Sequence, residues 1–475
     1  MDVTELTIKK LHEGLLRKEF SAREVIDQFI ERIEKYDGEI NSFITRTFDG
    51  ARADADKADK KIADYGEQVF KEFPLLGVPI AHKDLYLTQG IRTTAASKVL
   101  ENYIPQYSST SVVRLEKAGA IVLGKLNCDA WGHGSSGENS DFGPTRNPWD
   151  TNFVPGGSSS GSGASVAAGF ALAATGTDTG GSIRLPASFC SVVGVKPTYG
   201  RVSRYGVVAM ASSLDSMCHM ARTVEDAAMI LKITAGKDEH DATSSNVPVP
   251  NYLKDSNKGV RGLRIGLPKE YFGEGLSGEI RDVVLAAAKK LEKEGAEIVD
   301  VSLPSTEYGI SSYYILMASE VSSNLSRYDG VRYGKDRSFF GPEAKRRIML
   351  GTYSLSKGYA DKYYNQADKA RNLIKDDFVK VFESVDILLS PISPTPPFRL
   401  GEKSDDPLKM YLSDVLTVGV NLAGLPALAL PCGFTTEGLP IGMQFIGKEF
   451  DEATLFQGGA AFQTVTDFHT RNPKL

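Results

Sequence analysis

Cysteine is scarce in this chain of 475 residues, which contains only 4. The four cysteines, Cys128, Cys190, Cys218 and Cys432, lie far apart and form no C-x-x-C pair. A disulfide framework and a zinc site both rely on clustered cysteines, so this spacing argues against both. We therefore expect no metal site, and a reducing compartment fits the cysteine usage best.

Targeting signals and long apolar runs are also missing. The N-terminus carries Asp2 and Glu5 instead of a basic stretch followed by an apolar one, and it lacks the Arg-rich, acid-poor composition of a transit peptide. The most apolar segment, around residues 166–175, is well short of the roughly 20 residues that a membrane helix needs. We expect a cytoplasmic protein without a membrane span.

A strong charge of either sign is absent as well. Lys and Arg number 55 against 60 Asp and Glu, which gives a formal net charge of −5. Such a surface does not attract a polyanion over its whole extent, although a local basic patch is compatible with the total. Nucleic acid is therefore not the expected direct ligand.

The chain does have the composition and the patterns of a large α/β enzyme. Hydrophobic residues make up 41% and charged residues 24%, which is ordinary for a globular protein. Ser21-Ala-Arg-Glu24 is a capping box that precedes an amphipathic helix. Residues 263–267, 278–295 and 296–301 predict a strand, a helix and a strand, which together form a βαβ-like unit.

Other strands are predicted by short apolar runs that are bounded by glycine and proline. These runs are residues 75–80, 120–123, 385–389, 427–430 and 441–446, and a closing helix follows at 452–468. A linker or surface loop rich in Asp, Ser, Asn and Pro lies at about 236–260. We predict a single domain over residues 1–475, with a core at about 70–230 and late strands that rejoin the early sheet.

Residues 155–184 contain two Gly/Ser loops, in which we look for binding or catalytic motifs. The first, Pro155–Gly163, precedes a small-residue helix, and the second, Gly176–Arg184, follows it. Nucleotide-binding patterns fit poorly, because G-x-x-x-x-G-K-[ST] is absent and Val166 replaces the last glycine of G-x-G-x-x-G. A nucleophile elbow also fits poorly, because Val154-Pro155 is a poor strand end. Flexible turns remain the plain alternative.

Ser182, at the end of Thr179-Gly-Gly-Ser182, is a candidate nucleophile that needs a base. Backbone N–H groups beside it could hold an oxyanion. None of the 6 histidines has a compelling triad context, although His82, His133 and His219 fall near Gly-rich loops. Lys83 follows the predicted strand 75–80, where burial would lower its pKa and make it a competent base. Most lysines are solvated surface charges, so this observation is weak by itself.

The motifs around these residues resemble the amidase signature family. They are GxPxxxKD ending at Lys83 and Asp84, PGGSSSGS around Ser158 and TGGSIR around Ser182, and the spacing of the two serines is that of the family. The resemblance implies that Ser182 is the nucleophile, that Ser158 relays its proton, and that Lys83 is the general base. It also implies a mixed central β-sheet with helices on both faces.

Further details of the site follow from the same resemblance. The backbone of Thr179, Gly180, Gly181 and Ser182 would form the oxyanion hole, and the Gly157–Ser158 peptide bond would be cis. His82, beside Lys83, would depress the pKa of the lysine further if it carried a charge and pointed inward.

Four more segments resemble one branch of the family, the glutamine-hydrolysing subunits of tRNA-dependent amidotransferases. These segments are residues 201–206, 211–215, 322–334 and 421–426. The resemblance implies that ammonia from glutamine passes to a tRNA-binding B subunit, which converts Glu-tRNA(Gln), Asp-tRNA(Asn) or both. It further implies a small C subunit, only indirect contact with aminoacyl-tRNA, no cofactor in this chain, and ATP and Mg on the partner.

Selective binding of free glutamine needs a cation for its carboxylate and an anion for its ammonium group. Arg347 and Asp414 match the family positions for these two charges, although Lys345-Arg-Arg347 could equally be an ordinary charged helix face. Two segments depart from the sequence pattern of the branch. The segment 335–344 looks shorter than its counterpart, which puts a surface helix in doubt. The segment Ser216–Met220 differs in sequence from its counterpart, and we expect its His219 to be a packed residue near the core.

Two other functions compete with glutamine hydrolysis. A stand-alone amidase acting on small neutral amides would use the same triad, and a catalytically idle assembly protein would use none of it. Arg347 with Asp414 favours the glutaminase over the first alternative, and the intact set of Lys83, Ser158 and Ser182 argues against the second.

Overall fold

A computed structural model describes residues 2–332 and 334–475; Tyr333, within the family-like segment 322–334, lies outside the described residues. Its strands are β1 (Phe43–Arg46), β2 (Pro79–Lys83), β3 (Ile121–Leu126), β4 (Ala173–Asp178), β5 (Val193–Lys196), β6 (Ser216–Ala221), β7 (Arg264–Pro268), β8 (Glu297–Val301), β9 (Ile387–Pro391), β10 (Ala427–Phe434) and β11 (Pro440–Gly447). Its helices are α1 (Ile8–Arg17), α2 (Ala22–Ile40), α3 (Phe48–Tyr65), α4 (Val69–Glu72), α5 (Thr110–Lys117), α6 (Ser160–Ala167), α7 (Arg184–Cys190), α8 (Val224–Thr234), α9 (Gly278–Lys293), α10 (Gly309–Asn324), α11 (Pro342–Ser354), α12 (Tyr364–Val381), α13 (Pro407–Tyr411), α14 (Val418–Ala423) and α15 (Glu452–Thr464).

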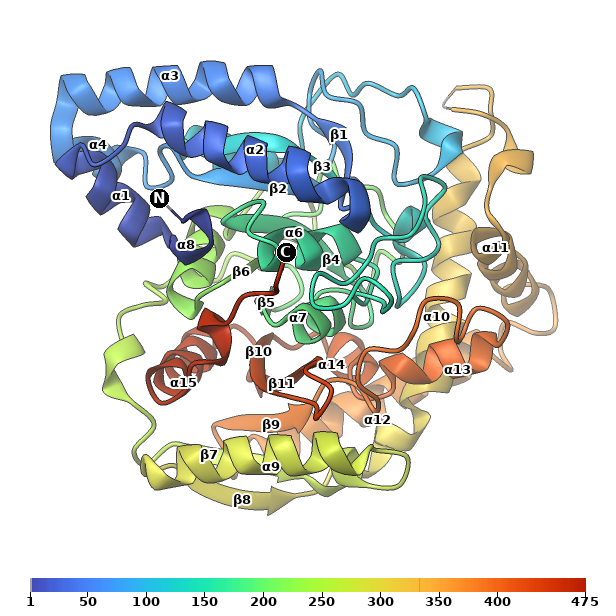
Figure 1. Cartoon of the computed structure of the whole chain (residues 1–475). Coiled ribbons are helices and arrows are strands. Elements are labelled where there is room, and N and C mark those ends of the chain that lie inside the picture. The colour runs from blue at the N-terminus through green and yellow to red at the C-terminus, as the bar shows by residue number, and fades with distance from the viewer. Residues whose placement is uncertain (1, 333) are drawn as a thin grey trace.

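All of these strands belong to one mixed sheet, in the order β1-β3-β2-β4-β6-β5-β10-β11-β9-β7-β8 (Figure 1). β2 runs parallel to both β3 and β4, whereas β6, β5, β10, β11 and β9 pair antiparallel in turn. The predicted βαβ unit is present, because β7 and β8 are parallel neighbours with α9 between them in the chain. The predicted fold class, α/β with a mixed central sheet, is confirmed.

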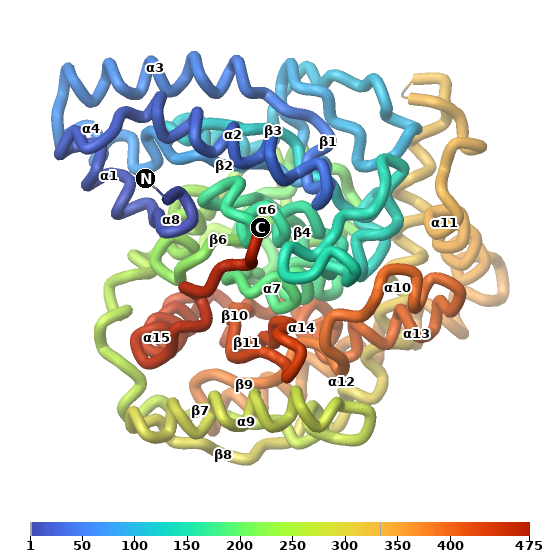
Figure 2. The backbone as a smooth tube through the Cα atoms, viewed as in Figure 1, coloured from blue at the N-terminus to red at the C-terminus, as the bar shows by residue number. Residues whose placement is uncertain are grey.

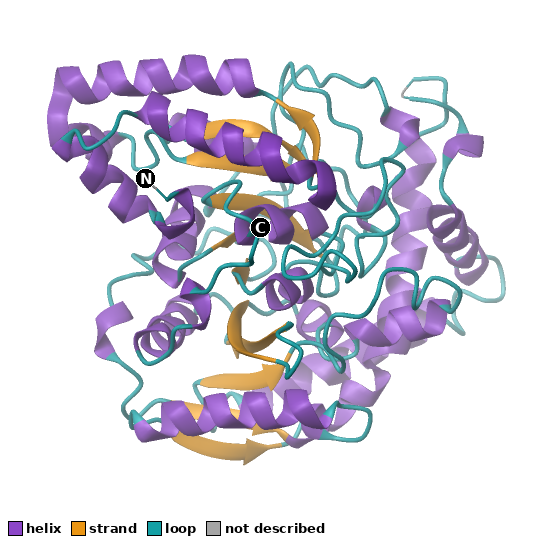
Figure 3. Cartoon of the chain, in the orientation of Figure 1, coloured by secondary structure: helices purple, strands orange, loops and turns teal. Residues whose placement is uncertain are grey.

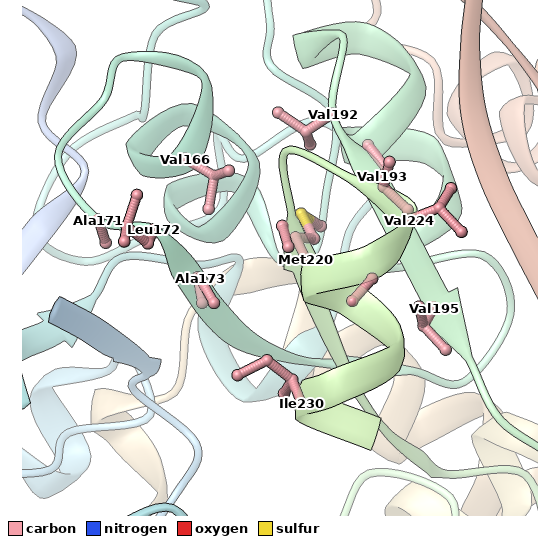
Figure 4. Packing of buried hydrophobic residues seen from close by; sticks show 14 of the residues in the cluster. Val166, Ala171, Leu172, Ala173, Val192, Val193, Val195, Met220, Val224 and Ile230 are labelled. Atoms are coloured by element: carbon pink, nitrogen blue, oxygen red, sulfur yellow. The ribbon is translucent and has the colours of Figure 1, made fainter. Parts of the chain in front are cut away.

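The sheet carries helices on both faces (Figure 3). Gly194 of β5 faces α7, since a Cβ at this glycine would lie 2.7 Å from Ala187 Cβ. Because side chains alternate along a strand, its neighbours Val193 and Val195 point to the other face. Figure 4 shows Val193 beside Val224 at the start of α8. The small residues of the signature segment therefore allow helices to pack closely on the sheet.

The two ends of the sheet are built from different parts of the chain. The N-terminal helices α1 to α4 gather beside β1, β3 and β2, and the unit of β7, α9 and β8 lies at the other end (Figure 2). The capping box is confirmed, because Ser21 and Glu24 exchange side-chain to backbone hydrogen bonds at the start of α2. No helix in the described parts of the chain is both long enough and apolar enough to cross a membrane.

Several predicted boundaries were wrong around the signature segment. The predicted strand 75–80 lies instead at Pro79–Lys83, so Lys83 is the last residue of a strand and does not follow one. The predicted small-residue helix ends at Ala167, and a strand, β4, then precedes the second Gly/Ser loop. β4 escapes detection because close packing requires small residues: a Cβ at Gly176 would lie 2.5 Å from Ile183 Cδ1.

Candidate active site

Two parallel strands bring the predicted base and the predicted nucleophile to one edge of the sheet. β2 ends at Lys83, and its parallel neighbour β4 ends at Asp178, immediately before the loop of Thr179 to Ser182. Parallel neighbours end at the same edge, so both segments emerge side by side. The register of β2 against β4 thus positions Lys83 near the second Gly/Ser loop.

Lys83 is fully buried and surrounded by hydroxyl groups. Its Nζ lies 2.8 Å from Ser158 Oγ, 3.0 Å from Ser159 Oγ and 2.8 Å from Thr177 Oγ1. Burial lowers the pKa of Lys83, and Cys128 and other neighbouring groups oppose this only in part. Hydroxyl partners do not stabilise the ammonium form as a carboxylate would, so the site favours a neutral amine.

Ser158 lies in the first Gly/Ser loop, just before α6 begins. The Gly157–Ser158 peptide bond is cis, as the family resemblance implies. A Cβ at Gly157 would lie 2.1 Å from Asp129 Oδ2, so a side chain does not fit at this position. The Ser159 N–H donates to Ser182 O at 3.2 Å and ties the first loop to the second. The structure therefore places Lys83 in contact with Ser158 and joins the loop of Ser158 to the loop that carries Ser182.

A buried ion pair fixes the loop that carries Ser182. Arg184 Nε donates to Asp178 Oδ2 at 3.0 Å, and both side chains are fully buried. Burial alone would raise the pKa of Asp178, but Arg184 outweighs it and holds the pKa at about 2. Asn421 Nδ2 also donates to Asp178 Oδ1 at 2.9 Å. This charged aspartate anchors both ends of the loop.

The same carboxylate changes the predicted oxyanion hole. Gly181 N–H donates to Asp178 Oδ1 at 2.8 Å, so this N–H is engaged and does not point to a substrate oxygen. Among the residues that the structure describes, no acceptor receives the N–H of Gly180 or of Ser182. The N–H of Thr179 has no acceptor among these residues either. Of the predicted donors, Thr179, Gly180 and Ser182 are thus the ones left to hold an oxyanion.

Thr179 and Gly180 are held by neighbours that sequence reasoning did not identify. Thr179 Oγ1 donates to Asp215 Oδ1 at 2.7 Å, and Thr417 Oγ1 donates to Gly180 O at 2.5 Å. Gly180 leaves room for Tyr313 of α10, since a Cβ there would lie 2.5 Å from the phenol oxygen. The loop is rigid because each of its residues has a buried partner.

A cavity of about 460 Å³ has Asp215 and Met217 among its lining residues. Burial raises the pKa of Asp215 to about 6, although the Thr179 hydroxyl opposes the shift. Asp215 thus lines the cavity and also accepts the hydrogen bond from Thr179 of the predicted oxyanion loop.

Asp414 is buried and contacts polar side chains, including Tyr314 of α10. Ser135 Oγ donates to Asp414 Oδ1 at 2.9 Å, and Tyr314 Oη donates to Oδ2 at 2.9 Å. Burial raises the pKa of Asp414 to about 6, against the effect of these two hydroxyls and of Arg347. The carboxylate is thus ready to accept further hydrogen bonds from a cationic ligand at neutral pH.

Arg347 is buried on the inner face of α11 and does not belong to an exposed charged helix face. Its Nε donates to Glu343 Oε1 at 2.8 Å, and its Cζ lies 5.7 Å from the Tyr314 ring centre. Burial lowers the pKa of Arg347, but Glu343 outweighs this and raises it above the ordinary value. Because Tyr314 also binds Asp414, one aromatic ring joins the two predicted charges. Within the short segment 335–344 the structure has the 3-10 turn Arg337–Phe339 and the first residues of α11.

The three histidines near the Gly-rich loops contribute no charge to the site. His82 Nδ1 lies 3.3 Å from Thr175 Oγ1, and burial lowers its pKa to about 3, so the suggested depression of the Lys83 pKa by a charged His82 does not occur. His219 Nε2 lies 2.7 Å from Ala227 O and is packed in β6, as expected. Burial and Arg347 lower the pKa of His133 well below its ordinary value.

Sequence reasoning missed the charged residues that support the site. Arg184 and Asp178 both lie in the signature segment, and their spacing next to Ser182 is the signal that could have identified them. Glu343 stands four residues before Arg347, which is the spacing of a helical ion pair.

The four cysteines are buried and free. Within residues 2–332 and 334–475, no cluster of three or more His, Cys, Asp or Glu side chains could hold a metal ion.

Known proteins resemble this chain along its whole length. The model of the Amidase family matches residues 24–456. The A subunit of glutamyl-tRNA(Gln) amidotransferase from Geobacter metallireducens is 51% identical over 486 residues, with 99% of both chains covered. The protein of the same name from Persephonella marina is 51% identical over 492 residues, with 100% of both chains covered.

Solved structures show the same likeness. The crystal structure of the glutamyl-tRNA(Gln) amidotransferase A subunit from Thermotoga maritima has a TM-score of 0.84 and 39% identity, and the match covers 100% of this chain and 98% of that one. The structure of 6-aminohexanoate cyclic dimer hydrolase has a TM-score of 0.89 and 25% identity, and the match covers 100% of this chain and 99% of that one.

Proposed function

This chain belongs to the amidase family, and from that premise we propose that it is the glutamine-hydrolysing A subunit of a tRNA-dependent amidotransferase. Full-length relatives that carry this name share about half of its residues. The observation that carries the proposal is that buried Arg347 and buried Asp414 both contact Tyr314, the first over its ring and the second at its hydroxyl. A cation and an anion beside one ring can bind the carboxylate and the ammonium group of a free amino acid.

The catalytic roles proposed for the triad are those that the family resemblance implies, and the contact of Lys83 Nζ with Ser158 Oγ supports the first proton transfer. Neutral Lys83 takes a proton from Ser158, which takes one from Ser182 as its Oγ attacks the carboxamide carbon. The N–H groups of Thr179, Gly180 and Ser182, which Asp178 does not engage, hold the oxyanion that forms. When it collapses, the proton returns through Ser158 to the leaving nitrogen and ammonia departs. Water then cleaves the acyl-enzyme ester and releases glutamate.

We propose that the ammonia is used by partner subunits. Relatives of this chain are named as A subunits, which supports a complex of several chains. A tRNA-binding B subunit would hold ATP, Mg and the aminoacyl-tRNA, Glu-tRNA(Gln) or Asp-tRNA(Asn), and a small C subunit would join the assembly. Ammonia is useful there only if it reaches an activated acyl group before it is protonated and diluted. Such a complex would work in the cytoplasm.

The test of this function compares two substrates in variants of Arg347. Arg347→Ala should raise the KM for glutamine roughly 10- to 150-fold, which is the loss of one charge-assisted hydrogen-bonded contact. A small neutral amide lacks the carboxylate, so its KM should change little. Steady-state kinetics on both substrates, with the exposed Lys345→Ala as a matched control, measure the difference. Equal losses on both substrates would favour a stand-alone amidase.

The pH dependence of glutamine binding should report on Asp414. Above its pKa of about 6 the carboxylate is charged and binds the ammonium group; as the pH falls through about 6, it is protonated and loses that charge. The KM for glutamine should therefore rise below this pH, and the KM for a neutral amide should not. Asp414→Asn should remove the pH dependence of KM. A parallel rise for both substrates would assign the effect to catalysis and leave Asp414 without this role.

A further inference from the structure

His133 is a buried histidine whose ring lacks a hydrogen-bond partner. It is 1% exposed, and among the residues that the structure describes neither of its ring nitrogens has a partner. His82 Nδ1 and His219 Nε2, by contrast, each have one. A buried polar group without a partner costs free energy, so such a group in a folded protein calls for an explanation. A ligand that binds during turnover would supply the missing partner.

The segment that carries His133 runs from the triad to the predicted ammonium site. A Cβ at Gly132 would lie 3.7 Å from Ser158 Oγ, so the residue before His133 borders the predicted proton relay. Ser135, two residues after His133, donates to Asp414 Oδ1 at 2.9 Å. His133 thus stands in the chain between a contact with the triad and a contact with the anion of the glutamine site.

The backbone of this segment is held by hydrogen bonds. The N–H of His133 donates to Ala130 O at 3.0 Å, and Asn139 Nδ2 donates to His133 O at 3.0 Å. The Asp129 carboxylate accepts the N–H of Gly137 at 3.0 Å and the N–H of Asn139 at 2.9 Å. Because both backbone groups of His133 are engaged, the fold positions its ring before a substrate binds.

Arg347 has part of its set of donors occupied within the protein. Its Nε donates to Glu343 Oε1 at 2.8 Å, and its Nη1 donates to Met317 Sδ at 3.4 Å. A carboxylate can accept about four hydrogen bonds, so a substrate carboxylate at Arg347 needs donors from other residues. Burial and the Arg347 guanidinium keep the pKa of His133 well below its ordinary value. The ring is therefore neutral and carries one N–H, which is a donor of the kind required.

We propose that His133 determines specificity in the glutamine site, and that its ring N–H donates to the α-carboxylate that Arg347 binds. The proposal rests on the proposed function, because it takes glutamine as the substrate and Arg347 as the partner of its carboxylate. The other polar groups of glutamine have partners of their own, since Asp414 binds the ammonium group and the loop of Ser182 binds the carboxamide. A neutral donor suits this position, because a second cation would be repelled by Arg347 in the empty site.

The experiment compares His133→Leu with His133→Gln in the full chain. Leucine fills much of the same space without a donor, whereas the Gln side chain offers an amide N–H. His133→Leu should raise the KM for glutamine about tenfold or more, which is the loss of one hydrogen bond to a charged group. It should leave kcat little changed, because the carboxylate is bound alike in the ground state and in the transition state. His133→Gln should keep a KM closer to that of the wild type.

Three substrates identify the group that the ring binds. 4-Carbamoylbutanoate is glutamine without its ammonium group, and 4-aminobutanamide is glutamine without its carboxylate. Measured by ammonia release, His133→Leu should raise the KM by the same factor for glutamine and for 4-carbamoylbutanoate, and should not raise it for 4-aminobutanamide. His219→Leu is the matched control, since it removes another buried imidazole, whose Nε2 lies 2.7 Å from Ala227 O. It should leave all three KM values unchanged.

Urea unfolding separates this role from a structural one. His133→Leu removes two buried polar atoms that have no partner, so it should unfold at the same urea concentration as the wild type or at a higher one. A lower midpoint, together with an equal rise in KM for all three substrates, would mean that the ring only shapes the site. That result would overturn the proposal.

The same measurements distinguish failure of the proposal from failure of the proposed function. An unchanged KM for glutamine in His133→Leu would overturn the proposal alone. A rise confined to glutamine and 4-aminobutanamide would assign the ring to the ammonium group and would overturn it as well. A wild-type chain that hydrolyses 4-carbamoylbutanoate but not glutamine would refute the proposed function, while a higher KM for 4-carbamoylbutanoate in His133→Leu would still support the contact. A wild-type chain that hydrolyses only 4-aminobutanamide would refute both.

Discussion

Ser182→Ala should lower amide hydrolysis at least about 10⁴-fold, because it deletes the atom that would form the acyl bond. Ser182 is buried, and its backbone oxygen accepts the Ser159 N–H, which the substitution leaves in place. Removing one hydroxyl in this setting should change the free energy of unfolding by no more than about 1 kcal/mol. The fold and the loop should therefore survive while turnover is lost.

Two measurements separate loss of chemistry from loss of structure in this variant. Glutamine should still bind, because Arg347 and Asp414 are unaltered, and calorimetry would detect it. Ser165→Ala provides the matched control, since Ser165 is also buried, lies in α6, and only donates to Ser162 O at 3.2 Å. It should retain full activity. Hydrolysis that persists in Ser182→Ala would remove this serine from the role of nucleophile.

Local patterns predicted the fold well where strand and helix periods are distinct. The unit of β7, α9 and β8 was found because its strands are apolar and its helix is amphipathic. β4 was missed because Ala173–Asp178 is made of small residues that also suit a helix. Its strand identity depends on pairing with β2 and β6, which lie far away in the sequence. Such tertiary contacts override local propensity.

The candidate site shows the same division between local and tertiary information. The motifs pointed to Ser182 and its loop, but residue chemistry alone gave Lys83 little weight, since its burial became visible only with the sheet around it. Spacing could not reveal that Asp178 engages the Gly181 N–H, because that bond depends on the turn geometry. Nor could it show that Tyr314 joins Arg347 to Asp414, residues that lie on different elements.

Lys83→Met should reduce hydrolysis about 10³-fold or more, because it removes the general base and replaces it with a side chain of similar length. Burial lowers the pKa of Lys83, so the wild-type rate should rise with pH as the amine becomes neutral. Lys83→Arg distinguishes two roles for this residue. Arginine keeps the positive charge but does not lose its proton, so it should be as inactive as methionine if Lys83 acts as the base.

The histidine beside Lys83 does not replace it as the base in this structure. His82 is bound to Thr175 and has a pKa of about 3, which makes it a very weak base. Wild-type activity in Lys83→Met would nevertheless transfer the role elsewhere, and His82→Gln in the same background would then show whether His82 had taken it.

The pH dependence of stability gives an independent check on the protonation state of Lys83. Its pKa in the folded protein is below that of the unfolded chain, so between the two values the unfolded state binds more protons. The free energy of unfolding of the wild type should therefore increase with rising pH over this range. That of Lys83→Met, which has no amine here, should not show this increase. Urea unfolding of both proteins at several pH values measures the difference. A difference that stays constant with pH would mean that Lys83 keeps its ordinary pKa, and a lysine that is charged at neutral pH could not take the proton of Ser158.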